Sequence, residues 1–154
     1  NDVQIIKKEL MEMSNEEIYL DQRLSILQGL ELESVLRTYN QEEQQGYLQK
    51  KYTDKSPVCS ELITAASIAQ RSNLDEQAQQ WRESFLKRQC AFQFPELSID
   101  MAQVHVDLAT NFAKKGDVEA AKDHLSIFFR LWVSADKDVL LYQKAQEQSD
   151  YLVR

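Results

Sequence analysis

Apolar residues recur at steps of three and four along most of the chain, the spacing that gathers them on one face of an α-helix. The first stripe consists of Val3, Ile6, Leu10 and Met13, and the second of Ile18, Leu20, Leu24 and Leu27. The polar pair Ser14–Asn15 separates the two stripes. A helical stripe continues beyond Gly29 to Tyr39, so this glycine either ends the second helix or lies inside a longer one.

Polar residues with capping character predict where the following helices begin. Asn40 and Glu43 have the spacing of a capping box, in which each side chain accepts a hydrogen bond from the other residue's backbone N–H. Ser56 and Pro57 close the clearest linker in the chain. Because proline is well suited to the first helical position, we expect Ser56 to be an N-cap.

The rest of the chain predicts five more helices, from Pro57 to about Arg71, over residues 75–91, 99–115 and 118–133, and from about Lys137 onward. The breaks between them fall at Ser72–Asn73, between Phe92 and Ser98 around Pro95, and at residues 134–136. The chain has three Gly and two Pro, which is little turn material for a protein of many strands. The sequence therefore predicts an all-α fold of seven or eight helices.

The segment from Leu108 to Phe128 has small residues where two helices would cross and bulky residues around them. It resembles a tetratricopeptide repeat (TPR), a helical hairpin of about 34 residues. Leu108, Ala109 and Phe112 match the first helix, Gly116–Asp117 the turn and Ala121 the second helix, with Leu125 and Phe128 at more permissive positions. His105 stands where the family often has Trp, and Val133 where it usually has Pro.

A looser copy of this hairpin lies 43 residues upstream. Leu62, Ala66, Ala69, Ala78 and Phe85 correspond to His105, Ala109, Phe112, Ala121 and Phe128. Asn73–Leu74 replaces the Gly-Asp turn, and Arg82 occupies a normally apolar place. The resemblance thus covers residues 57–133. Residues 1–56 are either an N-terminal helical cap or a divergent repeat, and residues 134–154 are a C-terminal capping helix of the same single domain.

The resemblance implies a right-handed α-solenoid-like array of antiparallel hairpins with a concave binding surface. By this analogy the partner-binding positions are Ser60, Ile63, Ser67, Gln70 and Arg71 in the first hairpin and Gln103, Val106, Thr110, Ala113 and Lys114 in the second. The expected function is that of a non-catalytic adaptor or scaffold that binds a protein or peptide. Changes at Gln70, Arg71, Val106 and Lys114 are expected to weaken binding without unfolding the domain.

The charge and the cysteines limit the partners and compartments. The net charge is −7, and the short Lys/Arg pairs form no basic face, so nucleic acid is not an expected partner. No apolar run approaches the roughly 20 residues that span a bilayer, so direct membrane insertion is not expected. Cys59 and Cys90 would meet at the open end of the first hairpin. A cytoplasmic location with free thiols is the first expectation, and an extracytoplasmic one follows if they pair. Because the chain begins at Asn1, we expect a processed form or an excised fragment.

Catalysis and cofactors have little support in the residue pattern. His105 and His124 would lie at one level of the second hairpin, but neither has the further ligands of a metal site, so a packing role for His105 is expected. No phosphate loop, zinc helix or nucleophile elbow is present, and we expect neither an enzyme nor a bound cofactor. Two alternatives to the adaptor remain: a sensor domain that binds a small ligand or signalling peptide, and a homodimerisation module built on clustered aromatic residues.

Overall fold

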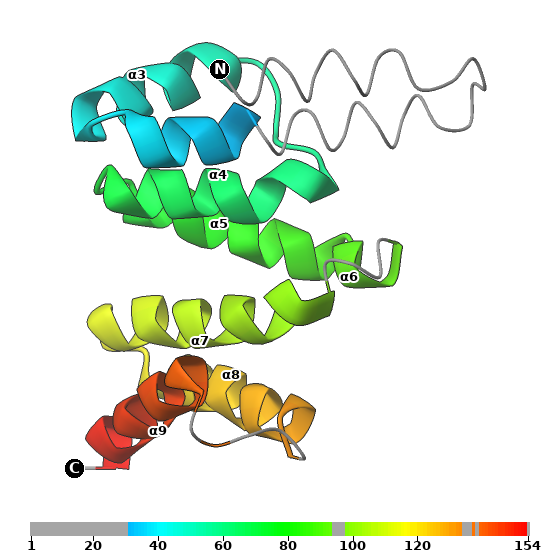
Figure 1. Cartoon of the computed structure of the whole chain (residues 1–154). Helices are drawn as coiled ribbons and strands as arrows, with labels where there is room; N and C mark the ends of the chain where they lie inside the picture. Colours follow the sequence, from blue (N-terminus) through cyan, green and yellow to red (C-terminus); the bar gives the residue numbers. More distant parts are fainter. Residues whose placement is uncertain (1–30, 94–97, 134–136, 138, 154) are drawn as a thin grey trace. The chain divides into compact units, whose positions relative to one another are not determined.

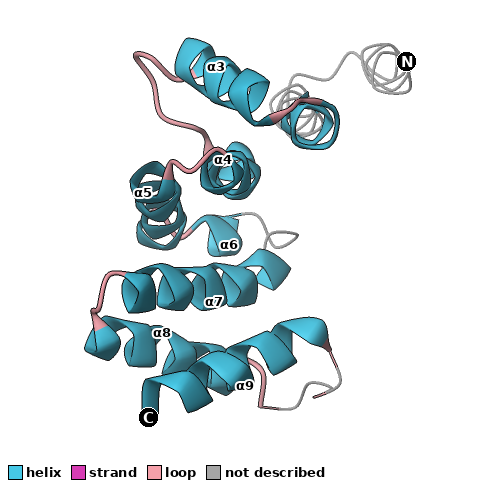
Figure 2. Ribbon diagram, turned by 90° about the vertical axis from the view of Figure 1, so that its left-hand side faces the viewer, coloured by secondary structure: helices cyan, strands magenta, loops and turns pink. Residues whose placement is uncertain are grey.

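The computed structural model describes residues 31–93, 98–133, 137 and 139–153 (Figure 1). Every regular element in these ranges is a helix, which confirms the all-α fold (Figure 2). None of the helices in the described ranges is long and apolar enough to cross a membrane. The expected helices before residue 31, the loop at Pro95 and the break at 134–136 lie outside the described residues. The chain divides into two compact units, Asn1–Phe85 and Leu86–Arg154, which we describe separately.

The described part of the first unit begins with a helical run over residues 31–38, followed by α3 (Gln41–Lys51). The capping box predicted at the start of α3 is confirmed. The Asn40 side chain accepts from the Glu43 N–H at 3.0 Å, and Glu43 accepts from the Asn40 N–H at 2.8 Å. Gln44, which is fully buried, donates to the carbonyls of Leu36 and Tyr39 and so satisfies the end of the preceding helix.

Helix α4 (Cys59–Arg71) begins two residues later than the sequence suggested. Its N-cap is Val58, with φ −78° and ψ 168°, and the expected Ser56 cap with Pro57 at the first helical position is wrong. The physical reason is Glu61, whose carboxylate accepts a hydrogen bond from the Val58 N–H at 3.1 Å. One half of a capping box thus fixes the start of α4, although Val58 has no side-chain acceptor to complete it.

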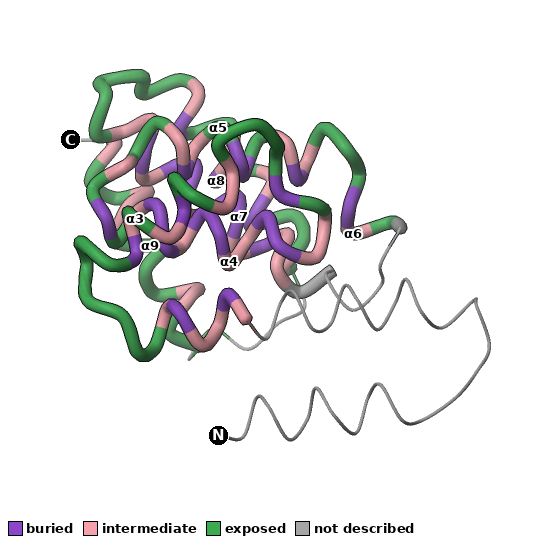
Figure 3. The backbone as a smooth tube through the Cα atoms, turned by 90° about the horizontal axis from the view of Figure 1, so that it is seen from above, coloured by how far each residue is buried: buried purple, intermediate pink, exposed green. Residues whose placement is uncertain are grey.

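Helix α5 (Asp75–Lys87) follows α4 after a tight turn. Asn73 has a positive φ of 58°, the Asn73 N–H bonds the Gln70 carbonyl, and the Leu74 N–H bonds the Ala69 carbonyl at 2.8 Å. This pair of bonds is the Schellman motif that commonly ends helices. Figure 3 colours the buried parts of the chain purple. The buried apolar core of this unit consists of Leu32, Val35, Leu48, Leu62, Ala65, Ala66, Ile68, Ala69, Ala78, Trp81 and Phe85.

The second unit contains α6 (Cys90–Gln93), α7 (Ser98–Lys114), α8 (Val118–Leu131) and α9 (Leu140–Val153). A continuous helix over 75–91 was expected and is wrong. Helix α5 ends at Lys87, because Gln89 adopts a left-handed φ of 54° and directs the chain into the separate short helix α6. The last helix begins at Leu140 rather than near Lys137. It packs against both α7 and α8.

A hydrophobic core joins α7, α8 and α9. Its buried members are Ala102, Val106, Ala109, Leu125, Phe128 and Ala145, with Phe129, Trp132, Leu141, Tyr142 and Leu152 packed at its edge. The α7–α8 turn repeats the geometry of the α4–α5 turn. Gly116 has φ 80°, its N–H bonds the Ala113 carbonyl, and the Asp117 N–H bonds the Phe112 carbonyl. Asp117 then caps α8 by accepting from the Ala120 N–H.

Candidate partner-binding surfaces

The face of α4 that the sequence suggested for partner binding is largely engaged within the first unit. Gln70 accepts a 2.6 Å hydrogen bond from the guanidinium of Arg82, which is fully buried. Arg71 is exposed, but its guanidinium donates to the Leu36 carbonyl at 2.9 Å. Gln70 therefore has a structural role as well as some exposure. The other predicted positions on this face are half-buried: Ser60, Ile63 and Ser67.

The corresponding face of α7 is partly covered by α9. Val106 is completely buried in the α7–α8–α9 core, so the expectation that it is exposed is wrong. Thr110 donates to Gln148 of α9 at 2.7 Å, and Asp107 accepts from Gln103 at 2.8 Å. Ala113 is half-buried. Of the predicted positions on this helix, Lys114 is exposed. Residues 140–153 thus occupy much of the surface assigned to a partner.

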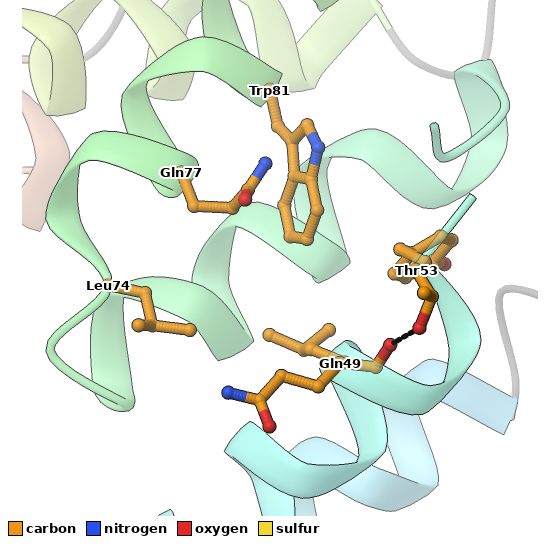
Figure 4. A pocket seen from close by; sticks show the side chains of 7 residues that line it. Gln49, Thr53, Leu74, Gln77 and Trp81 are labelled. Atoms are coloured by element: carbon orange, nitrogen blue, oxygen red, sulfur yellow. Dashed lines mark hydrogen bonds between the residues drawn. The ribbon is translucent and has the colours of Figure 1, made fainter. Parts of the chain in front are cut away.

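A groove of about 380 Å³ lies between α3 and α5 in the first unit (Figure 4). One wall comes from α3 and the residues after it, and the other from the start of α5. The lining residues are Leu48, Gln49, Tyr52, Thr53, Leu74, Gln77 and Trp81. In Figure 4 the side chains of Leu74, Gln77 and Trp81 follow one face of α5, opposite Gln49 and Thr53. Their spacing of three and four residues explains why they share a face.

The groove combines apolar surface with uncharged hydrogen-bonding groups. The Trp81 and Tyr52 rings meet edge to face with centroids 5.4 Å apart, and Leu48 and Leu74 add aliphatic surface. Gln49 and Gln77 each provide an amide donor and acceptor. The Thr53 hydroxyl donates to the Gln49 carbonyl. Among the described residues no Asp, Glu, Lys, Arg or His lines this groove, so these walls recognise a ligand by shape and hydrogen bonds.

A partly buried polar cluster adjoins Tyr52 and links α3 to α4. The Lys51 ammonium lies 3.1 Å from Glu61 and 3.6 Å from Glu31. The Tyr47 hydroxyl donates to Glu31 at 2.8 Å. Burial lowers the pKa of Lys51, but the hydrogen bonds of Tyr47 and Glu61 outweigh it and leave the pKa above its usual value. Lys51 therefore stays charged between its carboxylate partners.

The two phenols near Lys51 stay neutral. Burial, and then the Glu31 carboxylate, raise the pKa of Tyr47 to about 12 despite the opposing effect of Lys51. Burial and the Glu61 charge raise the pKa of Tyr52 further still. A neutral Tyr52 keeps the neighbouring groove uncharged across the physiological pH range.

The two histidines of the chain meet between α7 and α8, as the hairpin predicted. Their Nδ1 atoms lie 2.8 Å apart, and Phe112 stacks on His124 with ring centroids 5.5 Å apart. Burial, and then the neighbouring His124, lower the pKa of His105 to about 4. Among the described residues no group of three or more His, Cys, Asp or Glu could hold a metal ion. The pair is a hydrogen-bonded contact between two helices, which agrees with the packing role expected for His105.

Both cysteines are disulfide-bonded, so neither is the free thiol of the first expectation. The expected pairing of Cys59 with Cys90 stays a prediction.

The helical pattern did not predict the α3–α5 groove, because the groove is lined by two separate segments of the chain. Trp81 is buried, at 6% exposure, yet its ring also lines the groove. The available signal was the continuation of the Trp81 face toward the N-terminus of α5, where Leu74 and Gln77 lie at helical spacing. No protein-family model matches this chain, and no curated protein or solved structure matches it either.

Proposed function

We propose that this chain is a non-catalytic protein-interaction domain, an adaptor or scaffold that binds a peptide segment of a partner protein. The observation that carries the proposal is the α3–α5 groove, about 380 Å³ in volume, with aromatic and aliphatic walls and two glutamine amides. Peptide recognition uses this combination: apolar pockets take side chains, and amide groups bond the main chain. We place the site here rather than on the α4 and α7 faces, where Gln70 and Val106 are engaged in the fold.

We further propose that the two hairpins are TPR-like units of a right-handed solenoid. Two observations support this. Helices α4 and α7 both end in Schellman turns, with Asn73 and Gly116 in corresponding places. Ala66 and Ala109 are fully buried at the same offset, as are Ala78 and Ala121. Small buried residues at both helix crossings are what close packing of a hairpin requires.

The adaptor proposal can be tested by selecting ligands from a random peptide library displayed on phage and measuring their affinity by fluorescence anisotropy. Gln49→Trp places a bulky side chain in the groove and is expected to weaken binding at least tenfold. Lys50→Trp is the matched control, because Lys50 is an exposed neighbour on α3 that does not line the groove. Equal affinities of the two variants and the wild type would exclude the groove as the binding site.

A sensor of small ligands is the second candidate, and the groove volume favours it. A volume of about 380 Å³ falls in the range of roughly 300–1,000 Å³ typical of small-molecule sites. A metabolite that raises the melting temperature of the wild type and of Lys50→Trp, but not of Gln49→Trp, would support the sensor. Peptide binding without any such metabolite would support the adaptor.

A further inference from the structure

A second hollow lies beside the α3–α5 groove, at the start of α5. This hollow has a volume of about 370 Å³ and shares Leu74 and Gln77 with the groove. Its other lining residues are Asn73, Asp75, Glu76 and Gln80. The uncharged groove thus has as its neighbour a hollow with two exposed carboxylates.

The balance of charge at this end is negative. Asp75 and Glu76 are exposed, and neither forms an ion pair with a residue in the described part of the chain. They lie in the first turn of α5, where the helix dipole contributes only about half a positive charge. The two negative charges of the carboxylates are about four times as large as this positive charge.

The basic residues nearest to these carboxylates in sequence are Arg71 and Arg82, whose guanidinium groups donate to the Leu36 carbonyl and to the Gln70 side chain. On α3, Lys51 is held by Glu61 and Glu31. Asp54 and Lys55, which follow the groove residue Thr53, cancel one another in charge. The acidic hollow is therefore available to a cation that arrives with a ligand.

We infer that the partner segment has a bulky apolar side chain flanked by Lys or Arg. This inference rests on the proposed adaptor function and adds the chemistry of the partner. The apolar side chain lies against Leu48, Leu74 and Trp81, the glutamine amides bond the peptide main chain, and the basic side chain reaches Asp75 and Glu76. The groove volume suits one or two side chains, so the recognised motif is short.

The first experiment varies the ligand and uses the unaltered chain. The probe is a peptide selected from the random library, compared with an analogue in which its flanking Lys or Arg residues are replaced by Glu. We expect the analogue to bind about tenfold more weakly at low ionic strength, with a smaller difference at high salt because the carboxylates are exposed. Equal affinities, or selected peptides without flanking basic residues, would overturn the inference.

The second experiment reverses the charge of the hollow with Asp75→Lys and Glu76→Lys together. We expect the original peptide to bind about tenfold more weakly and the Glu analogue to regain affinity. Glu119→Lys is the control, because Glu119 lies in the first turn of α8 and is also exposed. Like the double variant, Glu119→Lys removes a favourable interaction between a carboxylate and the start of a helix. Because Glu119 does not line the hollow, we expect this variant to bind the peptide with unchanged affinity.

The outcomes separate this inference from the adaptor proposal. Peptides that lose affinity in Gln49→Trp but ignore the charge reversal would overturn the inference and leave the adaptor function standing. Peptides insensitive to Gln49→Trp would overturn the groove itself. Self-association of the chain that Gln49→Trp abolishes, measured by sedimentation, would identify a second copy as the occupant and overturn the inference.

Discussion

Lowering the pH from 7 to 5 is expected to reduce the free energy of unfolding by about 2 kcal/mol through His105 alone. The ordinary histidine pKa is 6.5, and in the folded chain the pKa of His105 lies at about 4. A folded pKa below the unfolded one means that the unfolded chain takes up the proton first. The stability contributed by neutral His105 is therefore complete above pH 6.5 and is lost progressively as the pH falls toward 4. The complete loss is about 3 kcal/mol.

The structure gives the reason for this shift. His105 is 6% exposed, and its Nδ1 lies 2.8 Å from that of His124. One ring must donate and the other accept, so the contact requires at least one neutral imidazole. Protonation of both rings would place two positive charges at ring centroids 5.1 Å apart.

Urea unfolding at pH 7 and pH 5, followed by circular dichroism, measures the effect. His105→Gln keeps a hydrogen-bonding group but removes the titrating one. Between pH 7 and pH 5 this variant is therefore expected to lose about 2 kcal/mol less of its free energy of unfolding than the wild type. His124→Gln is the control. Because burial is the larger cause of the shift, this variant keeps most of the wild-type pH dependence.

Parallel pH dependence in wild type and His105→Gln would refute the reasoning. Proton NMR gives a second, direct check. The chain has two histidines, so their ring signals can be assigned with the two variants. A titration midpoint for His105 near 6.5 in the folded chain would contradict the buried hydrogen-bonded arrangement.

Three further predictions concern stability and can be checked by urea unfolding at pH 7. Gly116→Ala is expected to cost about 1 kcal/mol, because φ is 80° and an added methyl meets no atom within 4 Å, so backbone strain alone acts. Gly46→Ala is the same change inside α3, where an added methyl also meets no atom within 4 Å, and it is expected to raise the free energy of unfolding by about 1 kcal/mol. If both substitutions changed the free energy of unfolding in the same direction, the argument from backbone conformation would be refuted. Asn40→Ala removes half of the capping box and is expected to cost about 1 kcal/mol, whereas an unchanged midpoint would contradict its role. Cys59 and Cys90 are disulfide-bonded, so replacing both by Ser is expected to lower the free energy of unfolding by about 2–4 kcal/mol, whereas an unchanged midpoint after reduction of the wild type would contradict this contribution.

Helix ends with a local chemical signal could be predicted from the sequence. Asn40 and Glu43 form the predicted capping box, and Gly116 and Asn73 take the left-handed conformation at the predicted turns. Each signal acts through hydrogen bonds within a few residues, so the neighbouring sequence contains it. The end of α5 has no such signal. Gln89 turns the chain without being Gly or Asn, and the expected helix ran on past it.

Exposure could not be predicted from local sequence. Val106 was assigned to a binding face by its position on one helix, but Ala145 and its neighbours on α9 share its core. The α3–α5 groove likewise depends on two segments more than twenty residues apart, Leu48 to Thr53 and Leu74 to Trp81. Whether a helix face is covered depends on packing between distant segments, and a helical pattern specifies only the face.

Glu61 serves two purposes with its two carboxylate oxygens. Oε2 accepts from the Val58 N–H and fixes the start of α4, while Oε1 pairs with Lys51 at the end of α3. A substitution at position 61 therefore disturbs two helix ends at once, and a change at Lys51 leaves a buried carboxylate uncompensated. In homologous chains we expect positions 51 and 61 to co-evolve, with apolar residues replacing both together or neither. Their effects in a double-mutant cycle would then be strongly non-additive.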